Sequence, residues 1–195
     1  WMIKFDGVSN DLLGDPQGYG RIEYAYHLMA KACGIDMMEC RLLEEHGRAH
    51  FMTKRFDRVG TEKLHMQTLC GIAHFDYNMP NFYSYEQAFQ VMRKLRLPYP
   101  DAEELFRRMV FNVICFNCDD HTKNISFLMD KQGGWRLSPA YDVTYAYHPE
   151  NRWLKQHQIA VNGKRENIYR GDLLKVASEM NIKRALDIIA SIQQT

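Results

Sequence analysis

Three polar side chains in the second half of the sequence have the types and the order that a phosphoryl-transfer site uses. Asp119 is followed five residues later by Asn124, and Asp142 comes 18 residues after that. A carboxylate can orient an attacking hydroxyl and accept its proton, while an amide oxygen and a second carboxylate suit Mg²⁺. The pattern therefore predicts transfer of phosphate from ATP, with Asp119 as base and Asn124 and Asp142 holding the metal.

The spacing from Asp119 to Asn124 also equals that of the catalytic loop of protein kinases. Alone, this spacing is weak evidence, because acids and amides are common in ordinary turns and helix caps. Asp120 is a second candidate for the base, but it lies only four residues before Asn124. The spacing therefore favours Asp119.

Two further side chains of this loop are candidate catalytic residues. His121 could contact Asp142 or a phosphate, and a histidine that only packs in the loop is an equally common arrangement. Lys123 could neutralise the transferring phosphoryl group, as cationic groups do at such sites. The alternative for Lys123 is a solvated lysine.

Helices are expected before the loop. Ser84 can cap a helix over residues 85–97, with Gln87 in the capping-box position, and Asp101 can cap the next helix, with Glu104 in the same position. The apolar residues of the second helix recur at helical spacing and predict a buried stripe: Leu105, Met109, Val113 and Phe116. This helix would aim the loop that follows it.

A hairpin is expected after the loop. Residues 125–129 read as a strand, residues 132–134 as a glycine turn, and residues 135–137 as a second strand. Asp142 follows that strand closely, so the hairpin would bring the two ends of the motif together. Further on, residues 158–161 predict a strand with a tight turn at 162–163, and residues 172–179 and 182–192 predict amphipathic helices.

The first 60 residues could supply groups that grip phosphate. Residues 1–5 alternate as a strand with Lys4 on the face opposite Ile3, and residues 22–33 read as a helix that Gly34 ends. Glu23 lies in the first turn of that helix. In kinases a strand lysine grips the phosphates and pairs with a helix glutamate, so Lys4 and Glu23 suit those roles. A solvated lysine and an acid favoured by the helix dipole are the alternative.

Composition excludes several classes of function. The chain has 195 residues, a formal net charge of +1 and no polybasic tract, which argues against direct binding to nucleic acid or membrane surfaces. No apolar stretch approaches the roughly 20 residues that span a bilayer, and no secretory leader is evident. The five cysteines are odd in number and scattered, as in a reducing cytoplasm. Cys115, Cys118 and His121 lack the second ligand pair of a structural zinc site, which favours small core residues.

Five segments together resemble the C-terminal kinase region of the HipA family of bacterial toxin serine/threonine kinases. They are residues 119–124, 137–142, 54–58, 22–23 and 159–164, and they are distributed over nearly the whole chain. The resemblance implies an α+β, bilobal, protein-kinase-like fold. Residues 1–60 would form a truncated N-terminal lobe, and residues 61–195 a mostly helical C-terminal lobe.

The resemblance also implies where the nucleotide would bind. Residues 54–58 would form the hinge between the lobes, where the backbone of Arg55 and Phe56 would hydrogen-bond the adenine. Asp57 would lie near the ribose or be tied to Arg58, and the sequence leaves both open. Gln67 would be a polar contact lining the cleft. Lys4 and Glu23 would form the phosphate-gripping pair.

A serine/threonine kinase with ATP and Mg²⁺ as cofactors is the function that follows from the resemblance. A protein such as an aminoacyl-tRNA synthetase would be the substrate, a HipB-like DNA-binding antitoxin the partner, and DNA would be reached only through that antitoxin. The chain would be the toxin of the pair. A pseudokinase that binds antitoxin and a small-molecule phosphotransferase remain alternatives.

One expected part of a kinase is missing from the sequence. A loop that covers the phosphates should precede the strand of Lys4, yet the chain starts at Trp1. The glycine-rich residues 14–20 follow the lysine and do not match a phosphate-loop pattern. We therefore expect that a further N-terminal segment or a companion chain completes the site and that this piece alone is a weak or inactive kinase.

Overall fold

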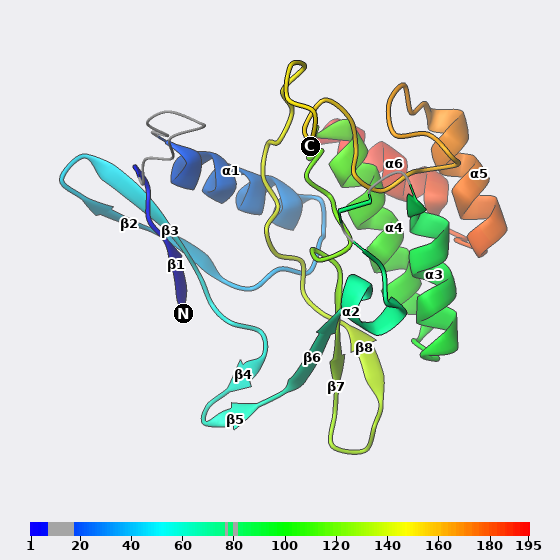
Figure 1. Cartoon of the computed structure of the whole chain (residues 1–195), viewed down its shortest axis with the longest axis horizontal. Coiled ribbons are helices and arrows are strands. Elements are labelled where there is room, and N and C mark those ends of the chain that lie inside the picture. Colours follow the sequence, from blue (N-terminus) through cyan, green and yellow to red (C-terminus); the bar gives the residue numbers. More distant parts are fainter. Residues whose placement is uncertain (8–17, 77, 80–81) are drawn as a thin grey trace.

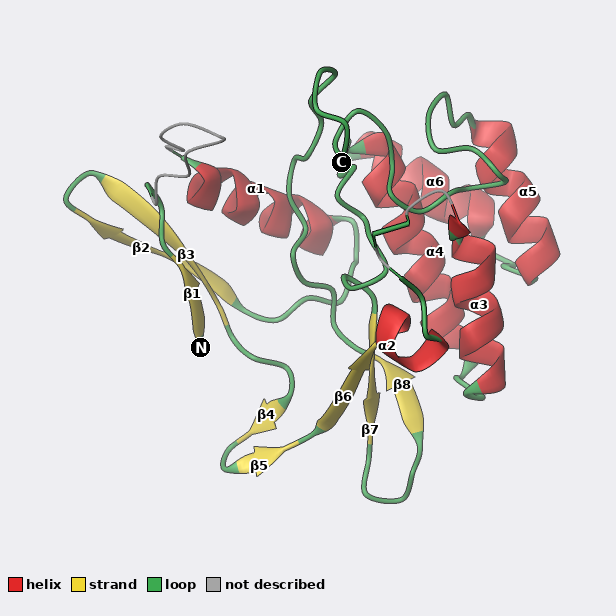
Figure 2. Cartoon of the chain, in the orientation of Figure 1, coloured by secondary structure: helices red, strands yellow, loops and turns green. Residues whose placement is uncertain are grey.

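The structure is a computed structural model of the chain, and it describes residues 1–7, 18–76, 78–79 and 82–195. Helices and strands form a mixed α+β arrangement, as the resemblance implies (Figures 1 and 2). Most of the glycine-rich stretch 14–20 lies outside the described residues.

The N-terminal part is an antiparallel sheet covered by one helix. The sheet has the order β1-β3-β2, formed by β1 (Met2–Lys4), β2 (Cys40–Glu45) and β3 (Arg48–Thr53). The two residues between β2 and β3, His46 and Gly47, have φ values of 49° and 77°, the left-handed geometry that a two-residue hairpin turn requires. Helix α1 (Tyr19–Ala32) packs on β2 and β3 (Figure 1).

Helix α1 begins three residues before the expected start and ends, as expected, before Gly34, whose φ is 75°. Its close approach to the sheet depends on Gly20, because a Cβ atom there would lie 2.1 Å from the carbonyl oxygen of Ala49 in β3. This contact places the start of α1, and Glu23 with it, against the sheet. Because the helix begins at Tyr19, Glu23 lies just beyond the first turn, not in it as expected.

A second sheet supports the predicted loop. It has the order β6-β7-β8, formed by β6 (His65–Thr68), β7 (Ser126–Met129) and β8 (Trp135–Leu137), so the predicted hairpin is confirmed. The mostly helical pattern expected from Leu64 onward is wrong at its start, because β6 pairs with β7 along its whole length. Only then does Thr68 cap the short helix α2 (Leu69–Ala73). A small ribbon of β4 (Arg58–Val59) and β5 (Glu62–Lys63) precedes β6.

Four helices form the other side of the molecule (Figure 1): α3 (Tyr85–Lys94), α4 (Tyr99–Ile114), α5 (Arg170–Met180) and α6 (Ala185–Gln194). The capping box of Ser84 and Gln87 at the start of α3 is confirmed, although the helix ends three residues earlier than expected. A strand was expected over residues 158–161, but only Ala160 and Val161 pair there, each in an isolated bridge. The predicted tight turn at Asn162 and Gly163 is present, with φ values of 49° and 73°.

The start of α4 and its predicted stripe need correction. Pro98 is the N-cap and the helix begins at Tyr99, so Asp101 lies inside the first turn and accepts a hydrogen bond from the backbone of Leu137 instead of capping. Leu105 and Met109 are fully buried, whereas Phe116 lies beyond the helix and is 51% exposed. The chain turns away at Phe116, whose φ is 54°, and the turn carries its ring out of the stripe.

The core joins these parts. One cluster of buried side chains includes Ala30 and Cys33 of α1 and its end, Phe106 and Val110 of α4, and Ile188 of α6. No helix in the described part of the chain is long and apolar enough to cross a membrane.

Candidate functional site

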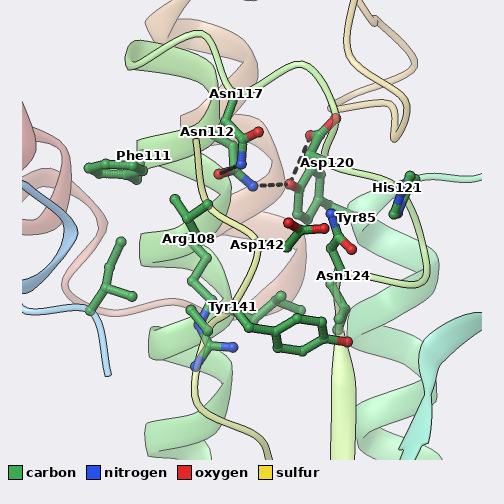
Figure 3. Close-up of a pocket in the computed structure, with 15 residues that line it drawn as sticks. Tyr85, Arg108, Phe111, Asn112, Asn117, Asp120, His121, Asn124, Tyr141 and Asp142 are labelled. Atoms are coloured by element: carbon green, nitrogen blue, oxygen red, sulfur yellow. Dashed lines mark hydrogen bonds between the residues drawn. The ribbon is translucent and has the colours of Figure 1, made fainter. Parts of the chain in front are cut away.

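Two of the three motif residues line one pocket. Asn124, in the loop between α4 and β7, and Asp142, after β8, both face a pocket that His121 also lines (Figure 3). The Asn124 side-chain nitrogen donates to the backbone oxygen of Asp119 at 3.0 Å. This bond closes the loop over the same five-residue interval that the sequence motif contains.

Tyr141 connects the two ends of the motif. Its hydroxyl donates to the backbone oxygen of Lys123 and hydrogen-bonds the Ser126 hydroxyl. Because Tyr141 adjoins Asp142 and Lys123 adjoins Asn124, these bonds hold the two candidate metal ligands in one place. Asp142 itself has a φ of 56°, a conformation that non-glycine residues seldom adopt.

Lys4 contacts two carboxylates from different parts of the chain. Its ammonium nitrogen lies 2.8 Å from Glu23 of α1 and also pairs with Asp142. Burial works against the charge, but Asp142 and Glu23 together raise the pKa of Lys4. Burial also raises the pKa of Glu23, against the effect of Lys4. The structure thus brings Lys4, Glu23 and Asp142 into one ionic cluster.

Asp119 is partly open to solvent. Its side chain is 44% exposed, and one of its oxygens lies 3.8 Å from the Nε2 atom of His121. Burial raises the pKa of Asp119; His121 opposes this shift, and the charge of Asp142 adds to it. A carboxylate with access to solvent and to a bound hydroxyl is suited to the role of base.

Asp120, the rival for that role, is held in a buried network. Its carboxylate accepts hydrogen bonds from the Tyr85 hydroxyl at 2.9 Å and from the backbone of Gln158 at 2.8 Å, and it pairs with Nδ1 of His157 at 3.2 Å. Asn112 donates in turn to the Tyr85 hydroxyl at 3.0 Å, and dashed lines in Figure 3 mark the bonds that join Asn112, Tyr85 and Asp120. These contacts hold the loop between α4 and β7 in place, so Asp120 has a structural role.

His157 carries a charge in this network. Burial disfavours the charged imidazole, but the charge and hydrogen bond of Asp120 prevail and raise the pKa of His157 to about 10. A charged histidine thus neutralises the buried carboxylate next to the candidate base.

Arg108 ties the segment before Asp142 to the helices. It pairs with Glu104 at 2.8 Å and donates to the backbone oxygen of Ser138 at 2.8 Å, while Glu104 accepts a hydrogen bond from the backbone of Asp36. The backbone of Ala140 donates to the oxygen of Asp36 at 2.7 Å. Arg108 of α4 and the backbone of Asp36 therefore hold the chain in place just before Asp142.

Two of the expected nucleotide contacts, Asp57 and Gln67, do not line this pocket. Asp57 is bound by two guanidinium groups, those of Arg55 at 2.7 Å and Arg58, which favours the structural alternative for that carboxylate. Hydrogen bonds from Arg55 lower the pKa of Asp57. The Phe56 ring lies 5.4 Å from that of Tyr141, centroid to centroid, and so reaches the site. Gln67 is exposed in β6, opposite Phe127, and the structure does not bring it to the pocket.

Oxygen donors for a metal are present but few. Across the residues that the structure describes, no group of three or more His, Cys, Asp or Glu side chains is placed to hold a metal ion. Asn124 and Asp142 offer two oxygen ligands, which fits Mg²⁺ because this ion usually keeps several waters and phosphate oxygens. All five cysteines are free, and burial raises the pKa of Cys115 to about 11.

Several residues of the site escaped the sequence analysis. The i,i+4 spacing of Glu104 and Arg108 was a readable signal for an ion pair on α4. For Tyr85, Tyr141 and His157 no local pattern existed, because their partners lie at least 15 residues away in sequence.

Comparisons with known proteins give the family. The family described as "HipA-like C-terminal domain" matches residues 1–195. The curated "Putative kinase Y4mE" of Sinorhizobium fredii is 28% identical over 131 residues, which cover 61% of this chain and 31% of the relative. A "Putative kinase" of Haemophilus influenzae is 27% identical over 143 residues, 66% of this chain and 42% of the relative. The chain thus matches less than half the length of these relatives.

Two solved structures share the fold. One, from Shewanella oneidensis MR-1, is titled as a toxin–antitoxin system of HipA, HipB and its operator DNA; its matched chain has a TM-score of 0.79 at 18% identity, over 98% of this chain and 49% of that one. The other is the proinflammatory kinase CtkA of Helicobacter pylori, with a TM-score of 0.60 at 14% identity, over 98% of this chain and 77% of that one. With the family match over its full length, this chain belongs to the HipA-like C-terminal domain family.

Proposed function

We propose that this chain carries the phosphoryl-transfer site of an ATP-dependent serine/threonine protein kinase. The observation that supports the proposal most is the position of Asp142, which pairs with Lys4 and lines one pocket with Asn124. The membership of the family and the kinase names of its relatives support the same reaction.

Each residue has a proposed part. Lys4, held by Glu23, binds and orients the phosphates of ATP, and Asn124 with Asp142 holds Mg²⁺, which neutralises charge on the phosphates when bound. Asp119 orients the hydroxyl of a substrate serine or threonine and accepts its proton. Lys123 neutralises charge on the transferring phosphoryl group, and His121 contacts Asp142 or a phosphate.

The nucleotide would lie outside the pocket of Asn124 and Asp142, because the cavity volume of about 30 Å³ suits a water molecule and no more. The backbone of Arg55 and Phe56 would hold the adenine, and the Phe56 ring beside Tyr141 would carry one wall of its site. Asp57 would keep Arg55 in place. Gln67 remains a candidate contact only if the nucleotide reaches β6.

The rest of the full-length protein or a companion chain would supply the phosphate-covering loop, so this piece alone would transfer phosphate weakly or not at all. A protein such as an aminoacyl-tRNA synthetase would be the substrate, in the cytoplasm, and growth arrest the result. The structural neighbour from Shewanella supports a HipB-like antitoxin as partner, with DNA reached only through it. Residues 1–60 and 61–195 would act as two lobes.

Nucleotide binding by the full-length protein tests the cofactor part of the proposal. A fluorescent ATP analogue would be titrated with and without Mg²⁺ against wild type, Asp142→Asn, and the control Asp187→Asn, whose side chain is 72% exposed on α6. We expect Mg²⁺ to strengthen binding to wild type and the control but not to Asp142→Asn. Equal Mg²⁺ dependence in all three proteins would contradict the assigned metal site.

A further inference from the structure

A second, larger pocket lies beside the candidate base. Its volume is about 300 Å³, and it lies between the end of α4 and residues 147–168, which is within the range of ligand sites. Its lining includes Phe116, Cys118, Tyr147, Lys155, His157 and Arg165. None of the residues assigned above to nucleotide, metal or proton transfer lines it.

One wall of this pocket is aromatic and is built at a conformational cost. The rings of Phe116 and Tyr147 lie 5.5 Å apart, and Phe116 is 51% exposed. Phe116 has a φ of 54° directly after the end of α4, where glycine is the usual residue and other residues cost about 1 kcal/mol or more. Because the Phe116 ring is half exposed, burial in the core does not offset this conformational cost.

Another part of the lining is positively charged. Lys155 is exposed at the rim, and the Arg165 guanidinium is held by a hydrogen bond from its Nε atom to the backbone oxygen of His157. His157 is itself the charged partner of Asp120. Glu166 is the one acidic residue in the lining that the structure describes, so positively charged side chains outnumber negatively charged ones there.

The pocket adjoins the site of transfer. Cys118 lines it, and Asp119 is the next residue, about 3.8 Å along the backbone. The backbone of Cys118 donates to Ala146 at 3.1 Å, and that of Ala146 donates to Phe116 at 3.1 Å. These bonds fix the pocket wall to the loop, so a ligand here would flank any hydroxyl that reaches Asp119.

We propose that this pocket binds an acidic side chain of the protein substrate, close in sequence to the residue that is phosphorylated. The carboxylate would face Lys155 and Arg165, and the neighbouring part of the peptide would pack on Phe116 and Tyr147. Charge complementarity of this kind selects partners and steers them into place. The inference rests on the proposed kinase function, because it assigns the class of substrate to that site.

Peptide binding tests the pocket without catalysis. Full-length protein carrying Asp119→Ala would be titrated with two fluorescein-labelled serine peptides, one with glutamates and one with lysines on both sides of the serine, and anisotropy would be read. We expect the acidic peptide to bind more tightly. Lys155→Glu should weaken its binding about fivefold, the upper range for one exposed charge pair, whereas Lys131→Glu on the distant, 80% exposed β7–β8 turn should not.

A second variant separates binding from folding. Phe116→Gly should leave the protein as stable as wild type or more stable, since glycine suits this φ, and yet weaken binding of the acidic peptide. Equal affinity for both peptides, or a loss of stability without a loss of binding, would overturn the pocket assignment. Selective binding of the acidic peptide, together with no phosphate transfer by the wild-type protein, would overturn the kinase proposal and leave the pocket standing.

Discussion

Lys4 connects the two halves of the candidate site, because its ammonium group contacts Glu23 from α1 and Asp142 from the segment after β8. The sequence could suggest the pair with Glu23 by analogy with kinases. The contact with Asp142 could not be inferred, since it spans 138 residues. The residue types in the sequence thus predicted the chemistry of the site, whereas only the fold shows which of its side chains contact one another.

Breaking the buried pair of Asp120 and His157 should destabilise the fold strongly. His157→Gln would leave the Asp120 carboxylate buried without its cation, which typically costs about 3 kcal/mol or more. Urea unfolding at pH 7 would measure the loss. The matched control is Lys175→Gln, whose partner Glu179 is exposed; this change should cost well under 1 kcal/mol. Similar losses in both variants would contradict the assignment.

The same pair should make stability depend on pH. The pKa of His157 is raised to about 10 from about 6.5 in an unfolded chain, so its contribution is complete below pH 6.5 and is lost as the pH rises through 10. Asp120 and the Cys118 thiol face the imidazole. The free energy of unfolding should therefore fall between pH 7 and pH 10 more in wild type than in His157→Gln. An equal fall of the free energy of unfolding with pH in both proteins would contradict this assignment.

At the scale of elements, the packing of α1 on β3 sets the position of Glu23. Gly20→Ala would push a Cβ into the Ala49 carbonyl at 2.1 Å, and overpacking of this kind costs about 1–3 kcal/mol. We expect lower stability and, because Glu23 follows in the same turn, weaker ATP binding by the full-length protein.

Gly171→Ala in α5 is the matched control, because a Cβ there meets no atom within 4 Å. This change should be neutral or stabilising by up to about 1 kcal/mol, since alanine favours helix. If Gly20→Ala were as harmless in thermal unfolding and ATP binding, α1 would not be held by this contact.

The cap of α3 can be tested in the same way. Ser84 accepts a hydrogen bond from the backbone of Gln87, and the Gln87 side chain accepts one from the backbone of Ser84. Ser84→Ala should cost about 1 kcal/mol, measured by urea unfolding. Ser178→Ala, at an exposed position of α5, should change little, and an equal effect of both would argue against the cap.

Elements with a strong local signal were predicted well. The capping box of α3, the β7–β8 hairpin and the tight turn at Asn162 and Gly163 all depend on residues close in sequence. Strand β6 was missed because it is defined by pairing with β7, about 60 residues later. The start of α4 was misplaced because Pro98 begins the helix without a side-chain cap, while Asp101, the apparent cap, bonds Leu137 instead.

At the scale of the whole molecule, the family and the fold are better determined than the partners. The fold is shared with the Shewanella structure over 98% of this chain at only 18% identity, and this chain covers 49% of that one. A likeness at this identity shows the fold alone, so the substrate and the antitoxin are proposals.

Transfer of radiolabelled γ-phosphate by the full-length protein to proteins of a bacterial lysate tests the central claim most directly. We expect a labelled protein band with wild type and with the control Asp187→Asn. Its intensity should fall by about 10²-fold or more in Asp119→Asn, and the band should be lost in Asp142→Asn. Undiminished labelling by both site variants, or no transfer by a wild-type protein that binds ATP, would contradict the account.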